Sequence, residues 1–482
     1  MLMLSFQENM HRVFLPLLLV ALVRSQDTCL SSEEEPYLLF GTKTAYIFAH
    51  KGLSNNNRAH EVPGCKPIAF WLMNRHGSHN PESNEIKELQ NLEKLKDNII
   101  LNYRNHNLRN SNHRMCPADV NLLERWLWNP RHNQTFAGDL TSDGYMSTQQ
   151  LAQAWRQKYP GLLTDNRHDY LFRFSNYQRS STTFRAFTEG LFKTQADGID
   201  LPKENDEKHI RPYKFCNTWV NNVEQNNETL TQRETFESSL EYKQMVTNVS
   251  QRLGFNYDME PQVVRNMYQM CAYNKAWDVT QISPWCAVFS HEDLKRLEYA
   301  EDLEAYYKYG YGSDLNEKVG CVYIKDMMAF FQKHIDNESI KRPRVSVLMA
   351  EAAGILLALR ASNAYRPTSP LTAETYPGGN SRWSSSTMAP YNANFAAILY
   401  KCTLNGKFQI NDKYQVLFLE NEKPISFEGC RVGLCDWSRV NTLFANVVNS
   451  CDLKACNVAT RGGPCVAIIL MIVVLILKIT RL

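Results

Sequence analysis

Three short segments of the chain are predominantly apolar, and each of them is followed by polar residues. They span residues 67–73, 170–174 and 345–348. A nearly continuous apolar run of this length is typical of a strand that is buried on both faces. Helical patterns follow at residues 85–101, 182–192 and 352–359. Strands that alternate with helices predict an α/β fold with a mostly parallel central sheet flanked by helices, whose binding crevice lies at the carboxyl ends of its strands.

Cap residues predict where two of the helices begin. Ser180 and Ser181 are candidate N-caps for the helix at 182–192. Residues 151–159 have a helical pattern, and we expect the helix that contains them to begin earlier, near the run Thr141-Ser142-Asp143-Gly144. These helices lie on either side of the second predicted strand.

The middle of the chain has a different pattern. Residues 202–310 contain charged helical stretches, at 231–253 and 291–309, and little strand character. This pattern predicts a helical domain over residues 201–330, inserted between two parts of the α/β core at 26–200 and 331–450.

The N-terminus predicts export. Residues 1–25 contain an apolar run at 13–23 followed by Arg24 and Ser25, as in a secretory signal peptide cleaved near Ser25. Asn133, Asn227, Asn248 and Asn337 each begin an acceptor sequence for N-glycosylation, which agrees with a glycoprotein of the secretory pathway. We expect it to be secreted or held at the extracellular face of the plasma membrane.

The C-terminal segment 451–482 ends in the apolar run 466–477. This run is shorter than the roughly 20 residues that a spanning helix needs. The small and polar residues before it favour a glycolipid-attachment signal, although Lys478 and Arg481 do not fit that pattern. A short single-span membrane anchor and a core segment are the alternatives.

Composition and charge exclude several classes of protein. With 44% hydrophobic and 21% charged residues, the chain is neither disordered nor coiled-coil. A net charge of +3 gives no general electropositive surface, so we expect no nucleic-acid partner. Thirteen cysteines favour disulfides, and Cys430 and Cys435 are spaced to close a tight loop. No repeated cysteine or histidine spacing indicates zinc, so we expect no metal cofactor.

The first predicted strand delivers the sequence Arg75-His76-Gly77. An arginine is a planar cation suited to phosphate, a histidine can act as a nucleophile, and a glycine would let a substrate approach the backbone. The wider run Arg75-His76-Gly77-Ser78-His79-Asn80-Pro81 resembles the Arg-His-Gly-x-Arg-x-Pro signature of the histidine acid phosphatases, and four of its five fixed positions match.

The resemblance continues along the chain and is closest to the multiple inositol polyphosphate phosphatases, the phytase-like branch of that family. Residues 174–179 with 186–192 resemble its second phosphate-binding segment. Residues 283–312 and 389–400 resemble further stretches of this branch, in the same order.

The resemblance implies hydrolysis of a phosphomonoester in two steps, without a cofactor. By position, His76 would be the nucleophile that forms a phosphohistidine, and Glu351 would protonate the leaving group. Arg75 and Arg179 would hold the phosphate, with His79 at the position of the second signature arginine. Inositol polyphosphates such as inositol hexakisphosphate, or bisphosphoglycerate, are the substrates that the resemblance implies.

Two departures from the family pattern lead to an alternative function. His79 replaces an arginine, and Met349 replaces the histidine that precedes the family's Ala-Glu pair. A His79 that gains its charge below neutral pH would make phosphate binding acid-dependent. If the two losses are not compensated, the chain is instead a weakened or inactive relative that acts as a surface binding protein.

Overall fold

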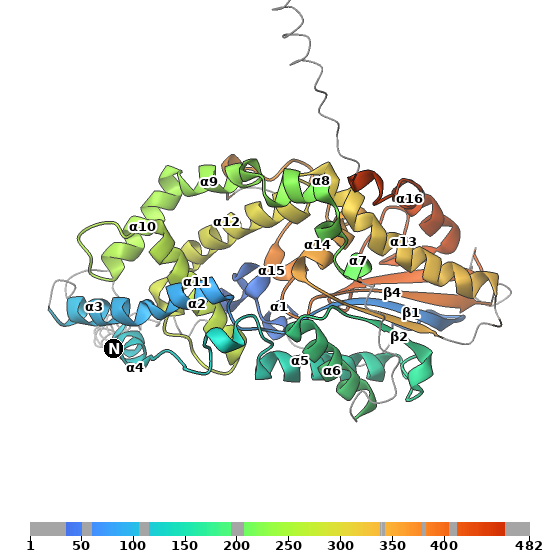
Figure 1. Ribbon diagram of the computed structural model, residues 1–482, viewed down its shortest axis with the longest axis horizontal. Coiled ribbons are helices and arrows are strands. Elements are labelled where there is room, and N and C mark those ends of the chain that lie inside the picture. Colours follow the sequence, from blue (N-terminus) through green and yellow to red (C-terminus); the bar gives the residue numbers. More distant parts are fainter. Residues whose placement is uncertain are drawn as a thin grey trace, which may run out of the picture.

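The computed structural model describes residues 35–50, 60–105, 115–193, 207–337, 339, 343–377, 382–403 and 412–457. The expected signal peptide at 1–25 and the apolar tail at 466–477 lie outside these residues and stay predictions. Within the described part of the chain, no helix is long and apolar enough to cross a membrane. Helices cover a central sheet, and a largely helical region extends from one end of it (Figure 1).

The sheet has seven strands, in the spatial order β2-β3-β1-β4-β5-β6, with β7 also paired to β5. They are β1 (Cys65–Arg75), β2 (Tyr170–Arg173), β3 (Val345–Ala350), β4 (Asn394–Cys402), β5 (Tyr414–Glu420), β6 (Lys423–Pro424) and β7 (Leu434–Asp436). The three predicted strands are β1, β2 and β3, which run parallel to one another at one side of the sheet.

The α/β class is confirmed, but the sheet is mixed rather than mostly parallel. β4 pairs antiparallel with β1, and β5, β6 and β7 continue the antiparallel half. The antiparallel pairing of β5 with β4 follows from the connection between them, which spans only residues 403–413. Such a short connection returns the chain beside the strand that it has just left, whereas parallel neighbours need a longer crossover.

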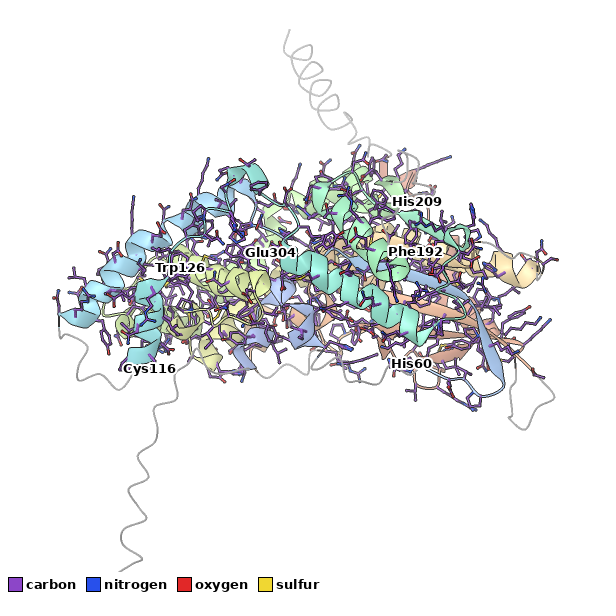
Figure 2. All side chains as sticks on the ribbon, turned by 90° about the horizontal axis from the view of Figure 1, so that it is seen from below. His60, Cys116, Trp126, Phe192, His209 and Glu304 are labelled. Atoms are coloured by element: carbon purple, nitrogen blue, oxygen red, sulfur yellow. A yellow bond between two sulfur atoms is a disulfide. The ribbon has the colours of Figure 1, made fainter. Side chains whose placement is uncertain are left out.

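The α-helices in chain order are α1 (Tyr46–Ala49), α2 (Ser83–Gln90), α3 (Leu92–Arg104), α4 (Pro117–Arg125), α5 (Ser142–Lys158), α6 (Gln178–Phe192), α7 (Glu207–Ile210), α8 (Asn217–Trp219), α9 (Thr231–Glu237), α10 (Leu240–Arg252), α11 (Pro261–Trp277), α12 (His291–Tyr309), α13 (Asp314–Asp336), α14 (Ala352–Ala361), α15 (Ser385–Met388) and α16 (Trp437–Asn449). Figure 2 places Cys116 and Trp126 toward the helical end, Phe192 and His60 toward the sheet end, and Glu304 between them.

Strand β1 is buried on both faces, which explains its continuous apolar run. Phe70 and Leu72 belong to one hydrophobic cluster, together with residues of α5 and α6. Trp71 and Met73 belong to the other cluster, together with residues of α13 and α14. Because side chains alternate along a strand, both layers of helices need an apolar partner on β1.

Two helix predictions need correction. The helix expected at 85–101 is two helices, because α2 ends at Gln90 and α3 begins at Leu92, on either side of Asn91. α6 begins at Gln178 with Tyr177 as its N-cap, so Ser180 and Ser181 lie inside its first turn. The Ser180 hydroxyl accepts a hydrogen bond from the Ser175 backbone N–H at 3.1 Å instead.

The expected stretch at 231–253 divides into α9 and α10, and Ser239 caps the second of them. The helix at 291–309 is confirmed with the same bounds. The start near Thr141 is also confirmed, because the Thr141 hydroxyl accepts from the Gly144 N–H at 3.0 Å as the N-cap of α5.

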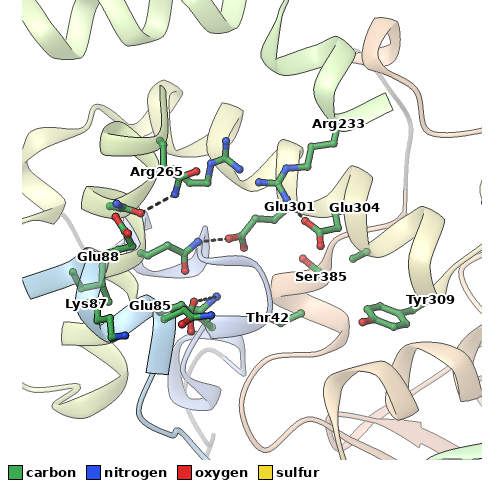
Figure 3. A pocket seen from close by; sticks show the side chains of 17 residues that line it. Thr42, Glu85, Lys87, Glu88, Arg233, Arg265, Glu301, Glu304, Tyr309 and Ser385 are labelled. Atoms are coloured by element: carbon green, nitrogen blue, oxygen red, sulfur yellow. Dashed lines mark hydrogen bonds and ion pairs between the residues drawn. The ribbon is translucent and has the colours of Figure 1, made fainter. Parts of the chain in front are cut away.

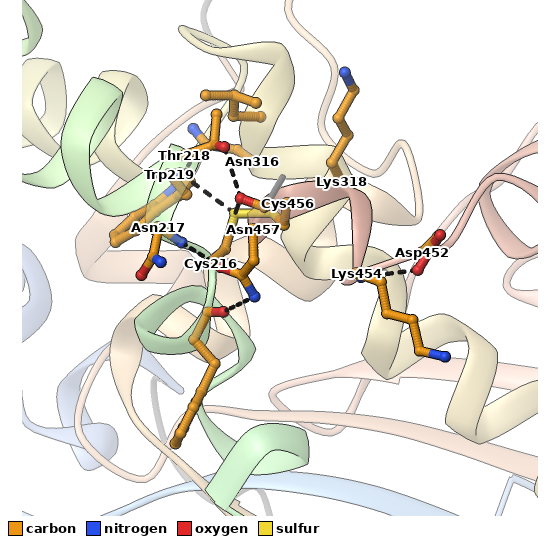
Figure 4. Close-up of a disulfide and its surroundings, with 12 residues drawn as sticks. Cys216, Asn217, Thr218, Trp219, Asn316, Lys318, Asp452, Lys454, Cys456 and Asn457 are labelled. Atoms are coloured by element: carbon orange, nitrogen blue, oxygen red, sulfur yellow. Dashed lines mark hydrogen bonds between the residues drawn. A yellow bond between two sulfur atoms is a disulfide. The ribbon is translucent and has the colours of Figure 1, made fainter. Parts of the chain in front are cut away.

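All eleven cysteines in the described residues are disulfide-bonded. The expected bond between Cys430 and Cys435 is present, and a bond between Cys65 and Cys402 joins the start of β1 to the end of β4. Figure 4 shows Cys216 bonded to Cys456, where Asn457 also accepts from the Asn217 N–H at 2.9 Å and donates to the Phe215 carbonyl at 2.9 Å. These bonds attach the last described residues to the segment around α8 and favour an oxidising compartment.

One ionic network ties the parallel strands to α13. The Arg173 guanidinium on β2 donates to both carboxylate oxygens of Asp326, at 2.7 and 2.6 Å. The Trp71 indole of β1 donates to the same carboxylate at 2.7 Å, and Arg173 also donates to the Ser346 hydroxyl of β3 at 3.0 Å. A single carboxylate thus holds groups from two strands of the sheet in place.

We predict that Asp326→Ala lowers the free energy of unfolding by about 3–5 kcal/mol, because it leaves the buried Arg173 charge without its partner. The control is Glu292→Ala, which removes the exposed ion pair with Lys295 and should cost less than about 1 kcal/mol. Urea unfolding with the disulfides intact measures both. Equal losses in the two variants would contradict the assigned role of Asp326.

Candidate active site

The ends of the central strands hold the Arg75-His76 segment in place. The Arg75 N–H donates to the Ala393 carbonyl at 2.7 Å, and the His76 N–H donates to the Ala350 carbonyl at 3.2 Å. The His76 carbonyl in turn accepts from the Asn392 N–H at 3.1 Å. The backbone on both sides of β1 therefore fixes where the His76 ring can lie.

Gly77 has a packing role in the structure. A Cβ atom at this position would lie 2.3 Å from the carbonyl oxygen of Gly144, in the first turn of α5. The expectation that Gly77 leaves room for a substrate is therefore wrong, because the space beside it is occupied by the α5 backbone. Thr141, the N-cap of α5, donates its N–H to the Ser78 carbonyl at 2.9 Å, so the helix start is fastened to the same segment.

The geometry of His76 suits a nucleophile. The side chain is buried, and Nδ1 lies 2.9 Å from the Gly77 carbonyl oxygen. A carbonyl only accepts hydrogen bonds, so Nδ1 carries the proton and Nε2 keeps its lone pair. Burial lowers the pKa of His76 well below its ordinary value, and the positive charge of Arg75 and the neighbouring His79 and Arg179 lower it further. The imidazole is therefore neutral, which is the state in which it can attack phosphorus.

Arg75 lies beside this ring with its guanidinium held by backbone carbonyls. Its Nη1 donates to the Ala389 carbonyl at 2.9 Å and also to the Thr42 carbonyl. The guanidinium carbon lies 4.5 Å from the centroid of the Tyr391 ring, at cation–π distance. Burial lowers the pKa of Arg75 to about 10, so it keeps its positive charge at neutral pH.

The structure also brings His79 to this site. Its ring centroid lies 5.0 Å from that of His76 and 5.6 Å from that of Tyr391. Nδ1 lies 2.6 Å from the Asn80 carbonyl oxygen, so in the neutral ring Nδ1 donates and Nε2 only accepts.

The structure contradicts the hypothesis that His79 becomes a cation just below neutral pH. Burial lowers the pKa of His79 to about 3, with a further contribution from the charge of Arg179. A histidine is charged only below its pKa, so between pH 4 and pH 8 the ring is predominantly neutral.

Arg179 and Glu351 lie next to each other, although 172 residues separate them in the chain. Arg179 Nη2 is 3.7 Å from Glu351 Oε1. Glu351 directly follows β3 and is the N-cap of α14. The Tyr213 hydroxyl donates to its other oxygen, Oε2, at 2.6 Å. The structure thus brings four candidates from the sequence together, around the carboxyl ends of β1 and β3 and the first turn of α6. They are Arg75, His76, Arg179 and Glu351.

Met349 lies in the hydrophobic cluster between the sheet and helices α5 and α6, and only 1% of it is exposed. Its thioether cannot supply the charged hydrogen bond that a histidine would give at this position.

A cavity of about 530 Å³ is lined by residues of the helical region and by the segment that contains Thr42 (Figure 3), whereas Arg75, His76, Arg179 and Glu351 do not line it. Thr42 and Lys43 line it, and the Thr42 carbonyl is one of the two that hold Arg75. The Lys43 ammonium lies 4.0 Å from a Glu85 carboxylate oxygen and 5.5 Å from the centroid of the Tyr273 ring. Among the described residues, no group of three or more His, Cys, Asp or Glu is placed to hold a metal ion.

The sequence did not point to three residues of this site. Lys43 lies in a 3-10 helix (Gly41–Lys43) and Tyr213 lies in another (Pro212–Phe215), and neither segment has a recognisable motif. Glu82, which bonds to Arg179, immediately follows the signature run 75–81. The position of an acidic residue directly after the predicted anion-binding signature is the one feature of the sequence that points to Glu82.

The chain is similar to known phosphatases over most of its length. The profile described as histidine phosphatase superfamily (branch 2) matches residues 70–419. The chain is 32% identical over 463 residues to "Multiple inositol polyphosphate phosphatase 1" of Drosophila melanogaster, covering 94% of this chain and 95% of that protein. It is 27% identical over 432 residues to the protein of the same name from Gallus gallus, covering 86% and 91%.

Solved structures show the same fold. The phytase from D. castellii superposes with a TM-score of 0.68 at 17% identity, over 88% of this chain and 87% of that one. The Bifidobacterium longum multiple inositol polyphosphate phosphatase, solved in complex with inositol hexasulfate, gives a TM-score of 0.57 at 14% identity, over 82% and 94%. The chain belongs to branch 2 of the histidine phosphatase superfamily, which confirms the prediction of a histidine-type phosphatase.

Proposed function

We propose that the protein hydrolyses phosphomonoesters through a phosphohistidine on Nε2 of His76. The observation that carries this proposal is the hydrogen bond from Nδ1 to the Gly77 carbonyl, which leaves the Nε2 lone pair available in a neutral ring beside Arg75. Phosphoryl transfer needs positioning and positive charge around the equatorial oxygens, and guanidinium groups supply both.

The chemistry divides into two balanced steps. Nε2 attacks phosphorus, the P–O bond of the ester breaks, and protonated Glu351 gives its proton to the leaving alkoxide. Water then attacks the phosphohistidine and passes a proton to the Glu351 carboxylate, which frees inorganic phosphate and restores His76. Arg75 and Arg179 hold the phosphoryl oxygens in both steps, and His79 lies near enough to His76 to contact them. As a neutral ring with Nε2 as acceptor, His79 would accept from a protonated phosphate oxygen.

Inositol polyphosphates, such as inositol hexakisphosphate, are the substrate class that we propose, with bisphosphoglycerate as a further compact phosphomonoester. The names of the relatives in Drosophila and Gallus support the first class. The cavity of about 530 Å³, whose lining includes Thr42 from the segment that holds Arg75, is large enough for a ring with several substituents.

We also propose that the protein works in the secretory pathway or outside the cell. The disulfides support this location, as does the exposure of the acceptor residues Asn227, Asn248 and Asn337. A lipid or single-span anchor within residues 451–482 would place it at the extracellular face of the membrane.

A weakened or inactive relative that binds at a surface is the second candidate function. The neutral, accepting His79 and the buried Met349 favour it. A charge-assisted hydrogen bond contributes about 1.5–3 kcal/mol, so the loss of two in the transition state corresponds to a rate reduction of roughly 10²–10⁴-fold. The following experiments separate the two candidates.

We predict that His76→Ala abolishes phosphate release from inositol hexakisphosphate and from p-nitrophenyl phosphate between pH 4 and 8, because it removes the nucleophile. The matched control is His168→Ala, an exposed histidine in a 3-10 helix before β2, which should keep wild-type rates. Release by the wild type that persists in His76→Ala would contradict the phosphohistidine. No release from any variant, with all of them folded, would favour the binding protein.

Glu351→Gln should lower kcat/KM on inositol hexakisphosphate by roughly 10²–10⁴-fold, because the leaving alkoxide loses its proton donor. The loss of kcat/KM on p-nitrophenyl phosphate should be much smaller, since nitrophenolate leaves without protonation and kcat/KM does not include the later hydrolysis of the phosphohistidine, which both substrates share. Steady-state kinetics on the two substrates make this comparison within one variant. Equal losses on both would assign Glu351 a structural role instead.

The pKa of about 3 for His79 gives a prediction for the pH profile. The profile of kcat/KM reports ionisations of the free enzyme, and His79 is already neutral there above pH 4. His79→Gln should therefore leave the shape of the kcat/KM profile between pH 5 and 8 unchanged, whatever it does to the absolute rate. The wild-type kcat/KM could instead decline as the pH rises through about 6.5, the ordinary pKa of a histidine. If His79→Gln removed that decline, His79 would be a titrating cation.

A further inference from the structure

Arg179, one of the two guanidinium groups proposed to bind phosphate, is already paired with a carboxylate. Its Nη1 donates to Glu82 Oε1 at 3.0 Å and to the Gly138 carbonyl at 3.3 Å. Its Nη2 lies 3.7 Å from Glu351 Oε1. Both ends of the guanidinium fork therefore face oxygen atoms of the protein, in the way that they would face the oxygen atoms of a phosphate.

Glu82 lies at the surface, at the start of α2. The Glu82 side chain is 58% exposed, whereas that of Arg179 is 19% exposed. Glu82 is the N-cap of α2 and forms a capping box with Glu85: its side chain accepts from the Glu85 backbone N–H, and its own backbone N–H donates to Glu85 Oε2 at 3.0 Å. A phosphate that takes the place of the carboxylate at Arg179 has to break the bond between Arg179 and Glu82, but not the bond from the Glu82 N–H to Glu85 or any bond of the sheet.

Gly138 provides the room in which the pair lies. A Cβ atom at Gly138 would be 3.0 Å from Arg179 Nη1 and 3.1 Å from Glu82 Oε2, and the φ of +72° at this residue disfavours any side chain. The loop after the signature and the loop before α5 thus form a small space that contains one cation and one anion.

The neighbouring cavity has no surplus of positive charge either. Its lining has equal numbers of basic and acidic side chains, namely Lys43, Lys87, Arg233 and Arg265 against Glu85, Glu88, Glu301 and Glu304. Several of them are already paired: Arg233 bonds to Glu237 at 3.0 Å and also to Glu304, and Arg265 bonds to Glu237 at 3.2 Å. A substrate whose further phosphates reach into this cavity therefore meets carboxylates as well as cations.

We propose that Glu82 is a specificity-determining residue that competes with phosphate for Arg179. The inference rests on the proposed role of Arg179 in phosphate binding. A substrate phosphate has to displace the Glu82 carboxylate, and the displaced carboxylate stays close enough to repel further phosphates on the same molecule. The competition weakens binding of every phosphomonoester and selects against those with the most negative charge.

The first test is the binding of inorganic phosphate, measured by titration calorimetry. An exposed ion pair of this kind corresponds to a factor of about 2–5 in affinity, so Glu82→Gln should lower the Kd of phosphate by about 2- to 5-fold. Glu82→Ser, which keeps a residue favoured at an N-cap, should do the same. The gain should shrink at high salt, where exposed charges are screened.

The matched control is Glu124→Gln. Glu124 in α4 also forms an exposed ion pair with an arginine, Arg104, and its substitution changes the net charge by the same amount. It should leave the Kd unchanged. Arg179→Ala should weaken phosphate binding, which tests the proposed site independently of Glu82.

The second test is the ratio of kcat/KM for inositol hexakisphosphate to that for p-nitrophenyl phosphate. This ratio should rise in Glu82→Gln and Glu82→Ser and stay constant in Glu124→Gln. The inference is overturned if the wild type binds phosphate and Arg179→Ala weakens that binding, but neither Glu82 variant strengthens it. The proposed function would then still stand. Phosphate binding by none of the folded variants would overturn both.

Discussion

Three backbone hydrogen bonds at the end of β1 fix the position on which the whole site depends. They join Arg75 to Ala393, His76 to Ala350, and Asn392 back to His76, so the last residue of β3 and the two residues before β4 hold the segment that carries the nucleophile. The parallel partner β3 ends beside it and delivers Glu351, and the antiparallel partner β4 begins where Asn392 and Tyr391 end. A mixed sheet thereby brings a polar group to the same place from each side of its central strand.

The energetic problem at this place is that cations are buried close together. Arg75 is held by two carbonyls and the face of Tyr391. Burial, together with the nearby cations, lowers the pKa of both His76 and His79, which removes further positive charge. Keeping the two imidazoles neutral reduces the repulsion among the buried positive charges. The same constraint explains why a histidine in place of the signature arginine does not behave as a substitute cation.

Much of this could be predicted from the sequence. The apolar run before Arg75 required a strand buried on both faces, and the motif placed His76 at its carboxyl end, as observed. The resemblance to the histidine acid phosphatases indicated Arg179 and Glu351, and each of them follows a recognisable strand pattern. The direction of β4 and β5 was not predictable in this way, since periodicity shows that a strand exists but not which neighbour it pairs with.

Other features depend on contacts that no local pattern encodes. Gly77 faces the backbone of Gly144, which is 67 residues away in the chain, and Tyr213 reaches Glu351 from a short 3-10 turn. Glu82 was visible in the sequence, but its bond to Arg179 follows only from the way that α6 and the start of α2 lie together.

The central claim is that Nε2 of His76 becomes phosphorylated during turnover. Rapid quenching of the enzyme with inositol hexakisphosphate, followed by digestion under alkaline conditions and mass spectrometry of the peptide that contains residue 76, measures this directly. The account predicts an acid-labile phosphate on Nε2 of His76 that appears within one turnover and decays as free phosphate is released. Phosphate on Nδ1 or on another residue, or turnover with no phosphorylated enzyme at any quench time, would contradict it.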